Sequence, residues 1–244
     1  MQDLTEAQQK YFKGTQMKDA NGSLLVCYHR TNHDFDAFDK SKIGTGRDIG
    51  FLGQGFYFTT DAKYSEEYGR NQYTCYLNIQ KPFIINKADY QEIVDIMNYL
   101  RDRHPDYGQP NGPIELALQP SEEQHELTPK EFNGGFFFAG MWQAYSIQLT
   151  EYVKSHGYDG IIIDTPDAGN VFEIVVFEPN QIKAVDNLYP TSSDNFKDNS
   201  REYLKENIKK LSLAEQHVIT AHIKERAPKR NLFPKLHKHT TRGE

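Results

Sequence analysis

Residues 172–184 read FEIVVFEPNQIKA and constrain the fold more than any other stretch of the chain. The run of β-branched residues from Ile174 to Val176, followed by Phe177, is typical of a buried strand. Pro179 and the asparagine after it predict an exit turn, and QIKAV continues as a further extended run. Glu173 leads the apolar strand, and a carboxylate placed there needs a reason, because burying an unpaired charge is unfavourable.

Extended runs dominate the rest of the sequence, and helical patterns are few. The expected strands are LLVCYH (24–29), FYFTT (56–60) and YTCYLNI (73–79), which KPFIIN (81–86) continues as extended chain. GYDGIIID (157–164) is expected to be a turn that leads into a buried strand. The expected helices are residues 4–12, a short segment AKYSEEYG that Asp61 caps and Gly69 ends, residues 88–103, and MWQAYSIQLTEYVKSHG closed by Gly157. Strands and helices do not alternate regularly, so the sequence predicts an α+β fold and not a doubly wound one.

The composition changes after residue 189. Residues 1–189 contain 16 Lys and Arg against 27 Asp and Glu, a net charge of −11, whereas residues 190–244 contain 12 against 7, a net charge of +5. We therefore predict one folded domain over 1–189, and a linker with a basic helical tail over 190–244. Residues 104–135, rich in Pro, Gly, Gln and Glu, are expected to form a surface insertion.

Several classes of protein are disfavoured. No run approaches the roughly 20 apolar residues of a membrane helix, and no export signal opens the chain, so we expect a cytoplasmic protein that is not bound to a membrane. Cys27 and Cys75 lie in strand-like runs without metal-ligand spacing, which predicts buried reduced thiols and no metal. The glycine-rich run GFLGQG (50–55) precedes a strand, whereas a dinucleotide-binding or phosphate-binding loop precedes a helix.

Four segments together resemble the motifs of the ADP-ribosyltransferase superfamily. These are YHRT (28–31), GQGFYFTTD (53–61), YSEEYG (64–69) and FEIVVFEPNQIKA (172–184). The similarity is to the branch with a His-Tyr-Glu signature, which includes poly(ADP-ribose) polymerases and domains of bacterial and phage polyvalent proteins. It covers roughly residues 8–188 and does not reach the tail. The resemblance implies an ADP-ribosyltransferase-like split β-sandwich with flanking helices, and the domain over 1–189 as the catalytic domain.

The resemblance also implies a set of catalytic residues that act on NAD as a substrate. Glu173 matches the family glutamate, which holds a ribose hydroxyl, stabilises an oxocarbenium-like transition state and aligns the nucleophile. His29 matches the histidine that hydrogen-bonds an NAD ribose, and the backbone at Arg30 and Thr31 matches the segment that holds the nicotinamide carboxamide. Tyr57 matches the signature tyrosine.

Two further residues complete the NAD site implied by the resemblance. Tyr68 matches a second aromatic ring that stacks on nicotinamide, and Ser65 matches a serine that hydrogen-bonds the carboxamide. An aromatic clamp suits a planar, electron-poor pyridinium ring. No metal is implied, because nicotinamide is already a good neutral leaving group.

The chain departs from the family pattern at two positions. Arg30 replaces a glycine that usually follows the histidine, and its guanidinium could reach a phosphate or shield the site. Val171 stands two residues before Glu173, where arginine-specific toxins carry a second carboxylate, so we expect an acceptor other than arginine. The segment DTPDAGNVF (164–172) is expected to meet the acceptor.

The leading hypothesis is transfer of one ADP-ribose unit from NAD to a protein, an RNA or a DNA, by a toxin, effector or phage-defence enzyme. The basic tail could contact phosphates, although a solvated chain end explains its charge equally well. The alternatives are NAD hydrolysis, with water as the acceptor, and an NAD- or ADP-ribose-binding module with little turnover. An antitoxin or other neutralising protein is a further partner expected from a toxic activity alone.

Overall fold

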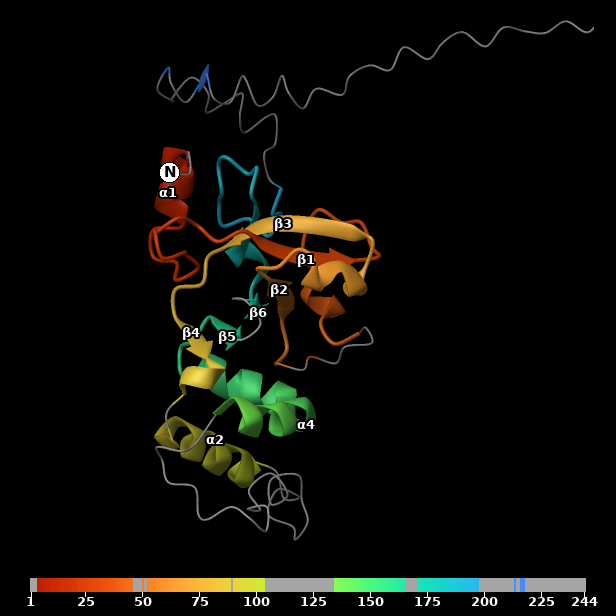
Figure 1. Cartoon of the computed structure of the whole chain (residues 1–244), viewed down its shortest axis with the longest axis vertical. Coiled ribbons are helices and arrows are strands. Elements are labelled where there is room, and N and C mark those ends of the chain that lie inside the picture. The colour runs from red at the N-terminus through yellow and green to blue at the C-terminus, as the bar shows by residue number, and fades with distance from the viewer. Residues whose placement is uncertain are drawn as a thin grey trace, which may run out of the picture. The chain divides into compact units, whose positions relative to one another are not determined.

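The computed structural model describes residues 4–45, 50, 52–88, 90–103, 134–165, 171–197 and three residues near the C-terminus (Figure 1). Contacts within the chain divide it into two units, residues 1–199 and 200–244. Of the second unit, Leu213, Gln216 and His217 are described, and all three are helical. The rest of the predicted basic tail, and residues 104–133 of the predicted insertion, lie outside the described residues.

The first unit is built on one mixed seven-stranded sheet. Its strands follow the order β4-β5-β6-β2-β1-β3-β7, and only β4 and β5 pair in parallel. The strands are β1 (Cys27–Thr31), β2 (Phe56–Thr59), β3 (Asn71–Leu77), β4 (Pro82–Ile84), β5 (Gly160–Thr165), β6 (Val171–Val176) and β7 (Ile182–Ala184). The predicted α+β class is confirmed, and the packing of two half-sheets as a split sandwich stays a prediction.

The helices in the described part of the chain are short, apart from two. They are α1 (Glu6–Tyr11), η1 (Lys40–Lys42), η2 (Tyr64–Tyr68), η3 (Ile85–Lys87), α2 (Tyr90–Arg103), α4 (Gly134–Ser155) and η6 (Pro179–Gln181). The segment AKYSEEYG was predicted as a helix capped by Asp61, and it forms the 3-10 helix η2. The N-cap of η2 is Lys63 and not Asp61, and it makes no side-chain cap bond; the Asp61 carboxylate accepts from the Lys63 amide at 2.8 Å, just before the helix. The helix expected over 141–157 begins earlier, at residue 134, and bends at Tyr145, where φ is −128°.

Strand β1 is displaced from the predicted segment LLVCYH. Leu24 forms an isolated bridge with Lys18, and the strand instead continues through Arg30 and Thr31. The cause is tertiary pairing, because β3 runs antiparallel to β1 along all five of its residues. A local apolar pattern does not specify pairing with a distant strand, so it does not fix the bounds of β1.

Two apolar clusters cover the two faces of the sheet. In β2 and β6, directly opposed residues share a face, so Tyr57 and Val175 lie on one side and Phe58 and Ile174 on the other. Val175 packs with α2 and α4 residues, including Ile96 and Leu149. Those two helices therefore cover the first face, below β4 and β5 in Figure 1.

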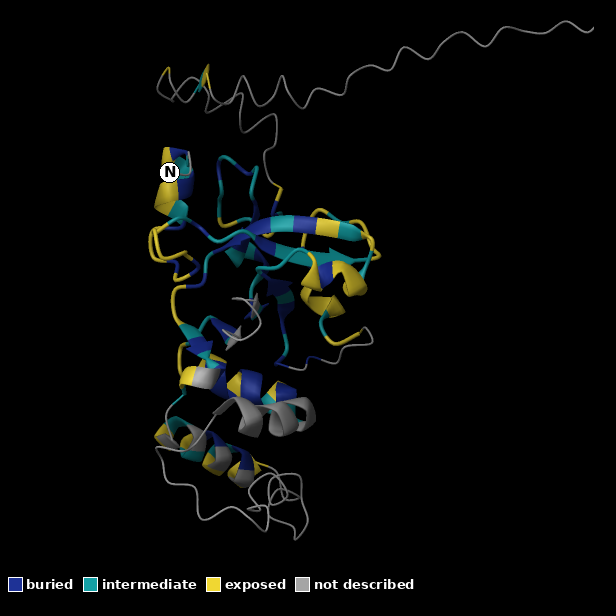
Figure 2. Cartoon of the chain, viewed as in Figure 1, coloured by how far each residue is buried: buried dark blue, intermediate teal, exposed yellow. Residues whose placement is uncertain are grey.

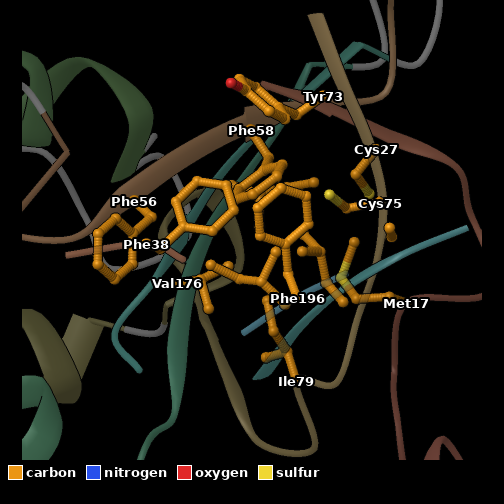
Figure 3. Packing of buried hydrophobic residues seen from close by; sticks show 14 of the residues in the cluster. Met17, Cys27, Phe38, Phe56, Phe58, Tyr73, Cys75, Ile79, Val176 and Phe196 are labelled. Carbon is orange, nitrogen blue, oxygen red and sulfur yellow. The ribbon is translucent and has the colours of Figure 1, made fainter. Parts of the chain in front are cut away.

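The second face is covered by an aromatic cluster that draws on distant segments. Figure 3 shows Phe38, Phe58 and Phe196 packed together, with Cys27 and Cys75 alongside. The two cysteines are cross-strand neighbours in β1 and β3, and both thiols are free and fully buried, as predicted. Burial raises the pKa of each thiol, so both stay protonated and unreactive.

Residues 190–197, at the start of the predicted linker, pack on the sheet. Phe196 is 1% exposed, and its carbonyl accepts from the Ala184 amide at 3.0 Å. Asn195 forms a bridge with Ala37. The predicted division at residue 189 stays a prediction, with these contacts on its C-terminal side.

Candidate active site

Glu173 lies inside the sheet and is half-buried. It pairs with Thr59 of β2 and Ile163 of β5. The three side chains therefore lie on the same face of the sheet, which α2 and α4 cover at other positions. Glu173 Oε1 accepts a short hydrogen bond from the Tyr64 hydroxyl of η2. Its Oε2 has no hydrogen-bond partner among the described residues. One carboxylate oxygen is therefore held by the protein, and the other can accept a bond from a ligand.

His29 lies on β1 with its ring in the aromatic cluster of the opposite face. The ring is 5.2 Å from Phe38 and 5.4 Å from Phe58, centroid to centroid. Its Nδ1 lies 2.8 Å from the Tyr57 carbonyl oxygen. Since a carbonyl only accepts, Nδ1 carries the proton and donates.

The protonation of His29 follows from this environment. Burial lowers the pKa of the imidazole, and the bond to the Tyr57 carbonyl opposes that shift only in part. The ring is therefore neutral near pH 7, with Nε2 as an unprotonated acceptor. Among the described residues Nε2 has no partner, so it could accept a hydrogen bond from a sugar hydroxyl.

His29→Asn is expected to flatten the loss of stability in acid. Because the folded-state pKa is below the unfolded value of about 6.5, His29 contributes stability that is present above that pH and is lost as the pH falls through the folded pKa. Asn can keep a donor for the Tyr57 carbonyl but does not titrate. Thermal unfolding at pH 7 and pH 5 measures the difference, with the exposed His33→Asn as control. Equal acid losses in wild type and His29→Asn would contradict this assignment.

Strands β1 and β2 separate next to His29. Their register joins Tyr28 to Thr59 and, in the described part of the chain, extends no further. Beyond that pair, the His29 imidazole donates to the Tyr57 carbonyl. The sheet is thus open between the two strands that carry four of the predicted NAD-binding residues, His29, Arg30, Thr31 and Tyr57.

Arg30 and Thr31 follow His29 on β1. The Arg30 guanidinium donates to Gln72 Oε1 at 2.7 Å and to the Gly69 carbonyl at 3.4 Å, while its buried Nε has no partner among the residues that the structure describes. The Thr31 hydroxyl oxygen accepts from the His33 amide at 3.3 Å. Arg30 is therefore directed at β3 and the end of η2, where uncharged amide and carbonyl oxygens accept its hydrogen bonds.

The Tyr57 side chain is not freely exposed, as the ring of an aromatic clamp would be. Its hydroxyl accepts from the Leu52 amide and donates to the Gly53 carbonyl, each at 2.8 Å. Its ring packs against the cluster under α2 and α4. Tyr57 thus holds the glycine-rich loop that precedes β2, and only the rest of its ring surface could meet a ligand.

Ser65 and Tyr68 both lie on η2. Ser65 is 3% exposed, and its hydroxyl donates to the Ala62 carbonyl at 2.7 Å. Tyr68 is 54% exposed and lies 6.3 Å from the ring of Tyr64. Figure 2 shows η2 as a mostly exposed segment beside β1. The structure therefore brings an open aromatic pair, and not Ser65, to the surface near Glu173.

Tyr64 was not predicted as a site residue from the sequence. Its hydroxyl bonds directly to the predicted catalytic carboxylate of Glu173. The available signal was its spacing, because Tyr64 precedes Tyr68 by about one helical turn. The family motif predicted a role only for Tyr68.

Gly69 is where η2 approaches β1. A Cβ on this residue would lie 2.6 Å from Thr31 Cα, so Gly69→Ala is expected to destabilise the domain by about 3 kcal/mol. Gly22→Ala is the matched control. That glycine has φ of +82° and no atom within 4 Å of the built Cβ, so only backbone strain of about 1 kcal/mol is expected. Denaturant unfolding measures both, and equal losses would contradict the close approach.

The remaining predicted features lie partly outside the described residues. Val171 pairs with Thr165 through its backbone, and residues 166–170 between them are not described. Within the described ranges, no three His, Cys, Asp or Glu side chains gather as metal ligands would. No described helix is both long and apolar enough to cross a bilayer. A cavity of about 400 Å³ lies against α2 and α4, and no predicted site residue lines it.

Comparison with known proteins identifies the family. None of the curated proteins matches the chain. A crystal structure of an anti-CRISPR protein aligns with a TM-score of 0.33 and 10% identity over 63% of this chain and 89% of that one, a likeness too weak to bear on fold or activity. The family model described as ADP-ribosyltransferase in polyvalent proteins matches residues 19–192, which span β1 to β7. The chain therefore belongs to the ADP-ribosyltransferases of polyvalent proteins, a family that transfers ADP-ribosyl groups from NAD.

Proposed function

We propose that this chain transfers a single ADP-ribose unit from NAD to a macromolecular acceptor and releases nicotinamide, with Glu173 as the catalytic carboxylate. The observation that carries the proposal is the half-buried Glu173 side chain, with one oxygen bonded to Tyr64 and the other without a described partner. Family membership supplies the reaction class. The position of the carboxylate supports its role in that reaction.

The proposed step breaks the bond between ribose C1' and the nicotinamide nitrogen. The bonding electron pair leaves with nicotinamide, which departs neutral, and positive charge develops on the ribose. Glu173 stabilises that charge and accepts a hydrogen bond from the ribose 2'-hydroxyl. A nucleophile of the acceptor then bonds to C1', and its proton passes to solvent water.

The other predicted residues have proposed roles in holding NAD. His29 would accept a hydrogen bond from a ribose hydroxyl at Nε2, and the backbone of Arg30 and Thr31 would hold the carboxamide where β1 and β2 separate. Tyr68 would stack on nicotinamide through its exposed ring. Tyr57 would mainly hold the glycine-rich loop before β2, and Ser65 would mainly hold the segment that leads into η2, because both hydroxyls already bond to backbone groups.

The proposed acceptor is a protein or a nucleic acid, modified at a group other than arginine. Val171 supports this restriction, because no second carboxylate stands two residues before Glu173 to activate a guanidinium. Residues 164–172 are the proposed acceptor-facing segment. The net charge of +5 over residues 190–244 would favour a phosphate-bearing acceptor.

The proposed setting is a toxin, effector or phage-defence enzyme in the cytoplasm, where NAD is available. Such an activity harms the cell that makes it, so a neutralising protein is its proposed partner.

Release of nicotinamide by the purified protein, with and without cell extract, tests the proposal against its alternatives. Transfer predicts release that rises when extract is added, because the acceptor is then present. Fast release without extract, together with free ADP-ribose, would favour NAD hydrolysis. NAD binding without release under either condition would favour a binding module and would overturn the proposed activity.

A further inference from the structure

Tyr64 lies directly beside the proposed catalytic carboxylate. Its hydroxyl donates to Glu173 Oε1, although the two residues are 109 positions apart in the sequence. Tyr64 is 42% exposed, whereas Glu173, inside the sheet, is half-buried and less exposed. The phenol therefore contacts the carboxylate from the solvent side of the site.

The backbone of Tyr64 is fixed by its own helix. The Asp61 carboxylate accepts from the amides of Lys63 and Tyr64, at 2.8 and 3.4 Å. The next residue, Ser65, is buried and donates to the Ala62 carbonyl. A tyrosine side chain has only two freely rotating bonds, so an anchored backbone places its hydroxyl closely.

The two carboxylate oxygens of Glu173 are consequently distinguishable. Oε1 is engaged by Tyr64, and Oε2 has no partner in the described part of the chain. A glutamate without such a bond would rotate about its terminal torsion and lose part of its alignment. The contact leaves one defined oxygen for the substrate.

We propose that Tyr64 is a positioning residue for ADP-ribosyl transfer, whose hydroxyl holds Glu173 so that Oε2 receives the ribose 2'-hydroxyl. This inference rests on the proposed function. Tyr64 keeps its proton throughout, Glu173 stays a carboxylate, and the electron pair of the broken C1'–N bond leaves with nicotinamide. The role of Tyr64 is thus to orient Glu173 and not to transfer a proton.

The ionisation of Tyr64 is consistent with that role. Its hydrogen bond to Glu173, followed by burial and by the negative charge of that carboxylate, raises the pKa of the phenol well above its usual value. The hydroxyl therefore stays protonated, and available as a donor, throughout the neutral range.

Tyr64→Phe tests the proposal, because it removes the hydroxyl and keeps the ring. We expect kcat for nicotinamide release to fall about tenfold, as for loss of one hydrogen bond to a charged group, with the KM for NAD unchanged. The matched control is Tyr158→Phe. Tyr158 donates to Glu92 at 2.9 Å, so this variant removes a similar bond away from Glu173 and is expected to keep the wild-type kcat.

A double-mutant cycle separates positioning from a general structural effect. In the Glu173→Gln background, measured in single turnovers with labelled NAD, Tyr64→Phe is expected to cause less than about a twofold further loss. An additional tenfold loss in that background would overturn the proposal, as would a wild-type kcat in Tyr64→Phe alone. A raised KM with unchanged kcat would also overturn it, by placing Tyr64 in NAD binding. A wild-type protein that releases no nicotinamide would instead overturn the proposed function itself.

Discussion

Glu173→Gln is expected to lower kcat for nicotinamide release by about a thousandfold, with little change in the KM for NAD. Glutamine has nearly the shape of glutamate, and its amide oxygen can still accept from Tyr64. It lacks the negative charge that stabilises a cationic ribose in the transition state. Removing one group that stabilises transition-state charge typically lowers the rate by about 10² to 10³.

The measurement is steady-state release of nicotinamide, together with the thermal unfolding temperature of each variant. Glu151→Gln is the control, because it removes an exposed carboxylate from α4. It is expected to retain the wild-type rate. A Glu173→Gln variant that unfolds normally and keeps more than about a tenth of the wild-type kcat would contradict the catalytic assignment.

Phe196→Ala is expected to destabilise the domain by about 3 to 5 kcal/mol, the range for truncating a buried aromatic side chain. The ring is 1% exposed and lies 5.2 Å from Phe38 and 5.5 Å from Tyr73, centroid to centroid. Those two rings also surround His29. A cavity at this position would therefore loosen the ring that is proposed to bind ribose.

Urea unfolding at pH 7 measures the loss of stability, and the KM for NAD in the same variant measures the effect on the site. Ile147→Ala is the control, because that side chain is 55% exposed on α4 and its truncation leaves no cavity. It is expected to change the stability by less than about 0.5 kcal/mol. A Phe196→Ala variant as stable as wild type would show that residue 196 lies outside the folded core.

The strands were predictable where their apolar pattern was local. The runs that became β2 and β6 carry β-branched and aromatic residues in the alternation that a sheet requires, and their positions agree with the prediction. Their pairing was not predictable, because it joins segments more than a hundred residues apart. That pairing places Glu173 opposite Thr59.

The surroundings of His29 show the same limit. A histidine after an apolar run could be recognised as a candidate through the family motif. Its neutral state depends on Phe35 and Phe38, which fold back from the following loop, and on a carbonyl of β2. None of these contacts follows from local sequence, so the tautomer could be inferred only from the folded chain.

The composition of the sequence predicted the end of the domain only in part. The change from acidic to basic sequence is real, yet a single aromatic residue in TSSDNFKDNS, Phe196, packs in the core. One large apolar side chain among polar residues carries little weight in an average over composition. Its burial of ring surface nevertheless contributes strongly to packing.

The most direct test of the proposed ADP-ribose transfer, with Glu173 as the catalytic carboxylate, is covalent labelling. NAD that carries a radioactive phosphate is incubated with cell extract and with wild-type protein or Glu173→Gln, and the products are digested separately with protease, DNase and RNase. We expect label on a macromolecule with the wild-type protein and not with Glu173→Gln, and we expect one of the three digestions to remove it. Equal labelling by both proteins, or labelled free ADP-ribose as the only product of the wild type, would contradict the proposed transfer.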